Sequence, residues 1–143
     1  NLFYSKEDFN EDISDWNTSN VTCMFWMFAD AYSFNQSIEQ WDVRKVKQMS
    51  YMFQCVSIFD QPLNKWVVSN VEDMSYMFNY ATEFNQPLNK WDVRNVIYMS
   101  NMFANTRDFN QNLNNWSFYY YCDITNMFYN AHSFKKHNLK KAF

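Results

Sequence analysis

The chain has 143 residues, of which 48% are hydrophobic and 22% aromatic, so it is long enough to bury one substantial core. Its net charge of −3 is unevenly spread, because residues 1–134 carry 8 basic and 15 acidic side chains (−7) and the last nine residues carry four lysines and no acid. An acidic body argues against a nucleic-acid partner. No apolar run reaches the roughly 18 residues of a transmembrane segment, and the absence of glycine excludes a glycine-rich phosphate-binding loop.

The sequence repeats every 25 residues from one end to the other. Such a fixed period is typical of arrays in which each unit buries its apolar face against its neighbours. A function is therefore expected on a repeated surface and not in a pocket inside a globular domain. The positions that keep the period are Phe9, Phe34, Phe59, Phe84, Phe109 and Phe134; Trp16, Trp41, Trp66, Trp91 and Trp116; and Met27, Met52, Met77, Met102 and Met127.

The repeat divides the chain, read as a single domain of residues 1–143, into a partial first coil, five full coils and a C-terminal cap. Leu2 and Phe3 fall in the phase of Met27 and Phe28, so the chain begins inside a repeat. From this we expect a processed product or a piece of a longer array. The predicted boundaries are 1–8 for the partial coil, 9–33, 34–58, 59–83, 84–108 and 109–133 for the full coils, and 134–143 for the cap.

Each coil has two halves with different periodicity. Apolar residues at i, i+3, i+4 and i+7 from Met99 predict a short helix. The order apolar, polar, apolar in Trp91-Asp92-Val93 predicts a three-residue strand with one buried face. Stacked coils then give a narrow parallel sheet on one side and helices on the other, with Trp66 and Phe78 buried at the centre.

Asparagine is expected to take the place of the missing glycine in turns, because it tolerates left-handed backbone conformations. Stacked asparagine side chains also form hydrogen-bonded ladders. Cys23, Cys55 and Cys122 occupy three different phases, which predicts free thiols. The asparagines predicted to form turns are Asn10, Asn35, Asn64, Asn85, Asn89, Asn110 and Asn114.

The cleanest repeat reads N-Q-P-L-N-K-W-D-V-R-N-V over 85–96 and M-S-N-M-F-A-N over 99–105. This signature resembles the 25-residue repeat of mycoplasma-type surface lipoproteins, which are grouped with BspA-like leucine-rich-repeat proteins, and the resemblance covers the whole chain. It implies an α/β solenoid of right-handed, leucine-rich-repeat-like coils. It also implies an extracellular, cell-surface or particle-surface location and a role in surface display or protein contact. The fifth coil departs from the signature, with S-F-Y-Y-Y-C over 117–122.

The candidate partner-binding residues are Trp26, Tyr51 and Tyr76, which lie between the two methionines of the helical stripe. On a helix they sit about 200° from the first methionine and point away from the core. Three exposed aromatics in successive coils would then form an apolar contact strip. In the alternative, the helix is short or 3₁₀ and the three side chains are half-buried packing residues.

The two ends of the array carry a second set of candidates. Neither end has an evident polar cap, which an open array usually needs. In one interpretation Phe118 and Tyr121 replace two core valines, and the tail folds over the end with Leu139 and Phe143 as anchors. In the other, Tyr119 and Tyr120 dock this end on a partner or a second copy.

Nothing in the sequence indicates catalysis. His132 and His137 lie near the end and keep no phase, and no nucleophile–base pair or metal-ligand set is present. We therefore predict no catalytic, cofactor-binding or metal-binding residue and no cofactor. The expected function is a non-enzymatic module for protein contact or assembly, with a protein partner or neighbouring subunits. The alternative is a carbohydrate-binding module of an adhesin, since rows of exposed aromatics suit sugar rings.

Overall fold

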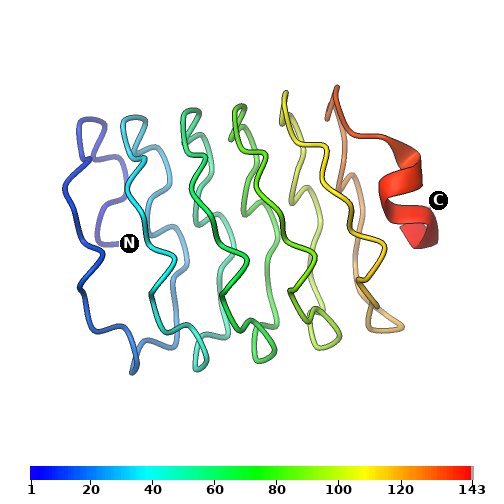
Figure 1. The fold of residues 1–143 in the computed structure, drawn as a ribbon, viewed down its shortest axis with the longest axis horizontal. Coiled ribbons are helices and arrows are strands. Elements are labelled where there is room, and N and C mark those ends of the chain that lie inside the picture. Colours follow the sequence, from blue (N-terminus) through cyan, green and yellow to red (C-terminus); the bar gives the residue numbers. More distant parts are fainter. Residues whose placement is uncertain (143) are drawn as a thin grey trace.

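The computed structural model describes residues 1–142, which form a row of coils stacked side by side with the termini at opposite ends (Figure 1). Within these residues the one regular element is η1, a 3₁₀ helix spanning Lys136–Ala142. The predicted α/β solenoid of right-handed, leucine-rich-repeat-like coils is therefore wrong, because the coils contain neither the helix nor the strand. Neighbouring coils are joined by isolated parallel bridges from Cys23 to Gln48, Gln48 to Asp73, Asp73 to Tyr98 and Tyr98 to Asp123.

The methionine stripe forms consecutive tight turns in place of a helix. The N–H of Met52 donates to the Met49 carbonyl at 3.2 Å, and a second turn follows between Phe53 and Val56 at 3.1 Å. Tyr51, the third residue of the first turn, has φ of 59°, as the third residue of a type II turn does. Each turn has four residues, and its hydrogen bond joins two residues that are three positions apart. The apolar side chains therefore keep the spacing of a helix and still reach the core.

The backbone N–H groups that these turns leave unused join one coil to the next. Tyr51 donates to the Ser75 carbonyl at 2.9 Å, and Cys55 donates to the Asn79 carbonyl at 2.8 Å. In this part of the coils up to Asn105, the N–H groups of one coil donate to carbonyls of the coil that follows it in sequence. Other N–H groups donate to the preceding coil, as from Glu72 to the Lys47 carbonyl at 2.9 Å, so backbone hydrogen bonds of both directions hold the coils together in place of a continuous sheet.

The predicted strand at Trp91-Asp92-Val93 is also a turn-bounded segment. The Trp91 N–H closes a turn onto the Leu88 carbonyl at 3.1 Å. The predicted alternation of burial is nevertheless present, because Trp91 and Val93 are buried and Asp92 is half-exposed. The Trp91 indole Nε1–H donates to the Leu63 carbonyl of the preceding coil at 2.9 Å, which satisfies a donor that burial would otherwise leave unpaired.

Columns of stacked aromatic rings fill the interior of the row. Trp66 and Phe78 are 3% and 0% exposed, which confirms their predicted burial. Within a phenylalanine column, ring centroids of successive coils lie 5.4 to 6.0 Å apart. The two columns consist of Phe3, Phe28, Phe53, Phe78, Phe103 and Phe128, and of Phe9, Phe34, Phe59, Phe84, Phe109 and Phe134.

The predicted ladder of asparagine side chains is present. The predicted turn role is confirmed for Asn64, Asn89 and Asn114, each the second residue of a hydrogen-bonded turn, whereas Asn10, Asn35, Asn85 and Asn110 lie outside turns. The Asn85 Oδ1 accepts the Asn110 N–H at 2.9 Å, and the Asp60 Oδ1 accepts the Asn85 N–H at 3.0 Å. None of the seven asparagines predicted to form turns has a positive φ. Within residues 1–142 the non-glycine residues with positive φ fall at two other phases: Ser5, Trp26, Asp30, Tyr51, Cys55, Tyr76, Tyr80, Asn101, Asn105, Asn126 and Asn130.

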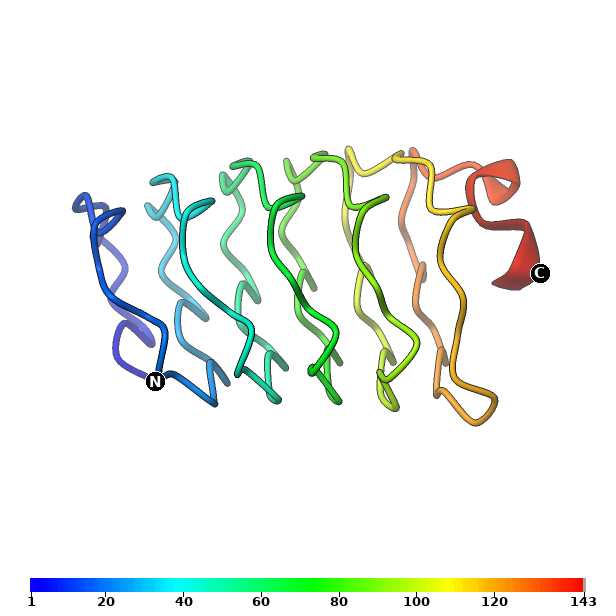
Figure 2. The same cartoon turned by 60° about the horizontal axis from the view of Figure 1, so that its bottom comes forward.

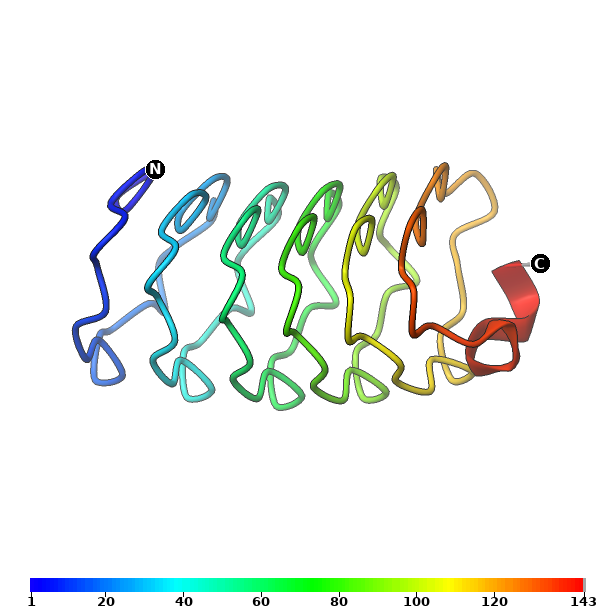
Figure 3. The same cartoon turned by 90° about the horizontal axis from the view of Figure 1, so that it is seen from above.

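At the C-terminal end, η1 takes the position of part of a further coil. The Lys135 N–H donates to the Asn110 Oδ1 at 3.1 Å, and the Leu113 N–H donates to the Asn138 carbonyl at 2.7 Å. Leu139, where the backbone of η1 kinks, is fully buried. Figures 2 and 3 show η1 lying against one edge of the last coil. Phe143, the second expected anchor of the cap, lies outside the described residues.

Candidate partner-binding surface

Trp26, Tyr51 and Tyr76 lie one above another on the side of the row, and all three are half-buried. Their φ angles are 55°, 59° and 56°, and their N–H groups donate to the carbonyls of serines in the next coil at 2.9 to 3.1 Å. The helical geometry that predicted full exposure is absent. A turn residue with positive φ places its side chain at the surface, resting against its neighbours in adjacent coils.

These side chains belong to a larger group of contacting rings, which we call the lateral ladder. The Tyr51 and Tyr76 rings stack with centroids 4.7 Å apart and an interplanar angle of 3°. The Trp26 ring stands edge-on to Tyr51 at 5.6 Å and stacks on Phe25 at 4.8 Å and on Tyr4 at 5.3 Å. Asn101 and Asn126 occupy the same phase in the following coils. The lateral ladder, Tyr4, Phe25, Trp26, Tyr51 and Tyr76, therefore covers the N-terminal part of the row.

Three polar groups lie in or beside the lateral ladder: the Tyr51 hydroxyl, the Asp73 carboxylate and the Trp26 indole N–H. Burial, with smaller effects of Tyr76 and Asp73, raises the pKa of Tyr51, so its hydroxyl stays a hydrogen-bond donor through neutral pH. The Asp73 carboxylate accepts the N–H and the hydroxyl of Ser75 at 2.8 and 2.6 Å. The Trp26 Nε1–H is buried and has no hydrogen-bond partner within residues 1–142. The surface thus combines flat apolar rings with a few directional polar groups.

The candidate end-docking residues Tyr119 and Tyr120 are 46% and 87% exposed. Phe118 packs against the core as expected, but Tyr121 does not, since it is 74% exposed. The turn here closes from Cys122 to Tyr119 at 3.0 Å, one residue later than the equivalent turn in other coils. This shift brings the Cys122 side chain against the core and leaves three consecutive tyrosines outside.

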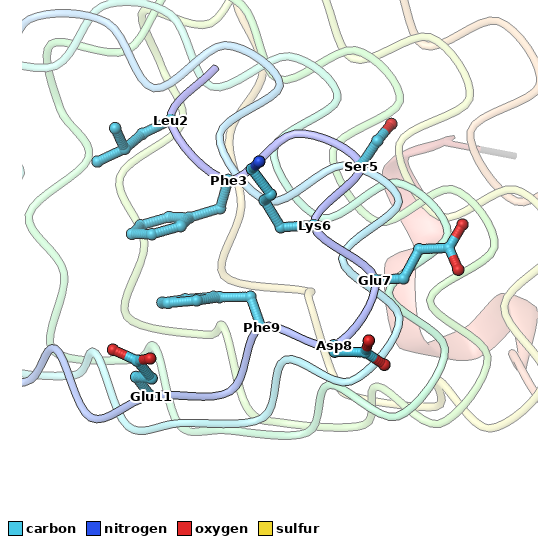
Figure 4. Close-up of a pocket in the computed structure, with 8 residues that line it drawn as sticks. All are labelled: Leu2, Phe3, Ser5, Lys6, Glu7, Asp8, Phe9 and Glu11. Carbon is cyan, nitrogen blue, oxygen red and sulfur yellow. The ribbon is translucent and has the colours of Figure 1, made fainter.

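A pocket at the N-terminal end was not predicted from the sequence. It is an open hollow of about 520 Å³ on the face of the first coil. Figure 4 shows Leu2, Phe3 and Phe9 pointing to the same side, whereas Glu7 and Asp8 point to the opposite side. Its lining consists of Leu2, Phe3, Ser5, Lys6, Glu7, Asp8, Phe9 and Glu11.

A pocket recurs beside the tryptophan of successive coils. Pockets of about 260, 300 and 400 Å³ lie beside Trp41, Trp66 and Trp91. The pocket beside Trp66 has a mainly apolar lining, because Val67 stands where the other two coils have an aspartate. In the pocket beside Trp41, hydrogen bonds from Arg44 lower the pKa of Asp42 to about 2. The indoles themselves are about 97% buried, so none of the three pockets offers an exposed aromatic platform.

Two further findings concern metal binding and membrane crossing. Within residues 1–142, no three His, Cys, Asp or Glu side chains lie close enough together to hold a metal ion. In that same stretch no helix has the length and apolar character needed to cross a membrane.

Comparison with known families identifies the family to which this repeat belongs. The model of the family described as "Mycoplasma protein of unknown function, DUF285" matches residues 1–88 and again residues 56–142. The chain belongs to this DUF285 family. The two matches overlap and together cover nearly the whole sequence, as expected for a model built on a repeat. No curated protein and no solved structure matches the chain.

Membership of DUF285 confirms the resemblance to mycoplasma-type repeats at the level of the family. The family description assigns no activity, so any function must be argued from the surfaces described above.

Proposed function

We propose that this DUF285 chain is a non-enzymatic protein-contact module, and that the lateral ladder binds its protein partner. The stacked pair of Tyr51 and Tyr76 carries the proposal. Aromatic side chains, tyrosine and tryptophan above all, dominate the binding energy of protein interfaces. Rings already held by stacking and by the turn backbone lose little conformational freedom on binding.

The position of the contact surface supports a display role. The lateral ladder runs along the row of coils, so a partner with an extended apolar face can touch several coils at once. The resemblance to mycoplasma-type surface lipoproteins supports a location on the outside of a cell or particle.

A carbohydrate-binding adhesin module is the alternative, and the pockets beside Trp41 and Trp91 favour it. The pocket beside Trp91 presents charged and amide groups, Asp92, Arg94 and Asn115, that suit sugar hydroxyls. The aromatic rings beside these pockets are buried, however, and stacking on a sugar face requires an exposed ring. We therefore prefer the protein-contact function.

The experiment compares pull-downs from the native source with a glycan array. We expect Tyr51→Ser with Tyr76→Ser to abolish capture of a protein that the wild-type chain retains. Tyr51→Phe with Tyr76→Phe should keep most of the capture, because the rings remain. Tyr98→Ser serves as a control, since it removes an exposed tyrosine that belongs neither to the lateral ladder nor to the candidate end-docking residues.

Half-burial of the two tyrosines means that the serine variant also loses stability, about 0.5–1.5 kcal/mol for each stacked pair removed. Binding is therefore measured at a temperature where near-ultraviolet circular dichroism shows the variant to be folded. Equal capture by the wild type and the double serine variant would contradict the proposal. Binding of a defined glycan without any protein partner would favour the alternative.

A further inference from the structure

The lateral ladder lies on a face that contains acidic side chains but no basic one. We define the lateral face as the parts of three successive coils that carry the ladder, namely residues 23–32, 48–57 and 73–82. These stretches contain Asp30 and Asp73 and no lysine, arginine or histidine. Both aspartates are half-buried, and neither forms an ion pair within residues 1–142. The face therefore carries two uncompensated negative charges beside its apolar rings.

Basic side chains appear on this side of the row where the aromatic ladder ends. In the two coils that follow, asparagine replaces the aromatic residue, and Arg107 and His132 occupy the phase of Tyr32. Arg107 is itself paired with Asp108 at 2.8 Å. Lys6, in the partial first coil, lines the open hollow described above. The lateral face itself therefore supplies no cation to its rings.

The aspartates act on the tyrosine hydroxyls of the face. The charge of Asp30 is the largest cause that raises the pKa of Tyr32. Burial, Tyr76 and Asp73, in that order, raise the pKa of Tyr51. A negative potential thus reaches the rings, and a positive group that approaches them is attracted both by this potential and by the electron-rich ring faces.

Tyr76 and Asp73 together form a site that suits an arginine side chain. Tyr76 stacks on Tyr51, and because Asn101 follows in the next coil, no second aromatic ring stacks on Tyr76 within residues 1–142. The Asp73 carboxylate accepts both hydrogen bonds from Ser75 on Oδ1, which leaves Oδ2 without a donor in the same stretch. A planar guanidinium can stack on an aromatic ring and pair with a carboxylate at the same time.

We infer that the partner of the lateral ladder docks through a basic segment, whose arginine side chains stack on the tyrosine rings and pair with Asp73 and Asp30. This contact depends on the proposed function, because it names the chemistry of the protein that the ladder binds. Lysine would supply the charge without the planar group that stacks, so arginine fits the face better. The attraction of opposite charges also orients the partner before the rings make contact.

Two short labelled peptides test this chemistry on the 143-residue chain, one of alternating arginine and serine and one with glutamate in place of arginine. Fluorescence anisotropy of the label measures the dissociation constants. We expect the chain to bind the arginine peptide and not the glutamate peptide, and to bind a lysine version several-fold more weakly than the arginine peptide. The affinity for the arginine peptide should fall in about 1 M salt, where the Debye length is about 3 Å.

Asp30→Asn with Asp73→Asn removes both charges and keeps the size of the side chains. The variant should fold, because Asn105 occupies the phase of Asp30 with the same left-handed backbone. The dissociation constant for the arginine peptide should rise about tenfold, from the loss of two charge-assisted contacts. Glu11→Gln with Asp15→Asn is the matched control, since it removes two exposed negative charges outside the lateral face and should bind like the wild type.

Three results would each overturn the inference: no preference for the arginine peptide, an unchanged dissociation constant in the Asp30→Asn, Asp73→Asn variant, or an equal loss in the control. Pull-downs in about 0.1 M salt separate these results from a failure of the proposed function. Capture that is lost with Tyr51→Ser and Tyr76→Ser, but unchanged with the two asparagine substitutions, would keep the ladder as the contact surface and reject a basic partner. Unchanged capture by the serine variant would reject the proposed function, and the inference with it.

Discussion

Substitution of Phe78 by alanine should be much more costly than the same change at the end of its column. Phe78 is fully buried, and its ring stacks on Phe53 and Phe103 at 5.5 Å and on Phe84 at 4.1 Å. Deletion of a core aromatic of this kind costs about 3–5 kcal/mol in the free energy of unfolding. Phe3 is half-buried and has a column neighbour on one side only, so Phe3→Ala should cost about 1–3 kcal/mol.

Urea denaturation followed by tryptophan emission measures both losses. Each coil contacts only its neighbours, so a defect in the middle also weakens the coupling between the two halves of the row. The Phe78→Ala transition should therefore be broader than that of the wild type, while the Phe3→Ala transition keeps its slope. Equal losses at the two positions, or a central loss below about 1 kcal/mol, would refute a core built from stacked columns.

Three further predictions concern a left-handed turn position and the cysteine thiols. Tyr80 is 51% exposed with φ of 59°, so Tyr80→Gly should raise the free energy of unfolding by about 0.5–1 kcal/mol. Tyr98 is exposed but does not have a positive φ, so Tyr98→Gly should lower the free energy of unfolding by a similar amount. Chemical denaturation of the two variants checks the difference in sign. Burial raises the pKa values of Cys55 and Cys122 to about 11, so iodoacetamide at about pH 8 should modify the exposed Cys23 first. Because these two folded-state pKa values lie above the usual thiol value of 9.0, their stabilising contribution is complete below about pH 9 and is lost as the pH rises towards 11, which urea midpoints across that range would show.

The period, the core and the polar ladder could be predicted from the sequence, because each depends on which side chains recur. Trp66 and Phe78 keep the phase of the repeat and are buried, and Asn85 sits in the expected ladder. These features follow from chemistry that is the same in every coil, whatever the local backbone conformation.

The local conformation could not be predicted in the same way. Apolar spacing of i, i+3, i+4 and i+7 arises in a helix, but it arises equally when two four-residue turns follow one another, as they do from Met49 to Val56. The sign that separates the two is a positive φ at Tyr51, and a bulky aromatic is an unusual residue for that conformation. The one-residue shift at Tyr119–Cys122 could not be predicted either, because Tyr121 has the phase of the core residue Val96 and only the late turn leaves it outside.

The choice of residue at the left-handed positions bears on function. The conformation costs about 1–2 kcal/mol for most residues and least for asparagine. The C-terminal coils use asparagine there, at Asn101 and Asn126, while the N-terminal coils carry Trp26, Tyr51 and Tyr76 in the same backbone conformation. The backbone therefore does not require an aromatic at this phase, and the array bears a higher conformational cost where it has one. Mutual stacking of the rings offsets part of that cost, but stacking alone does not explain why part of each side chain is left at the surface. The proposed protein-contact surface would explain it, because binding would bury the exposed part and recover the hydrophobic stabilisation that the free chain lacks.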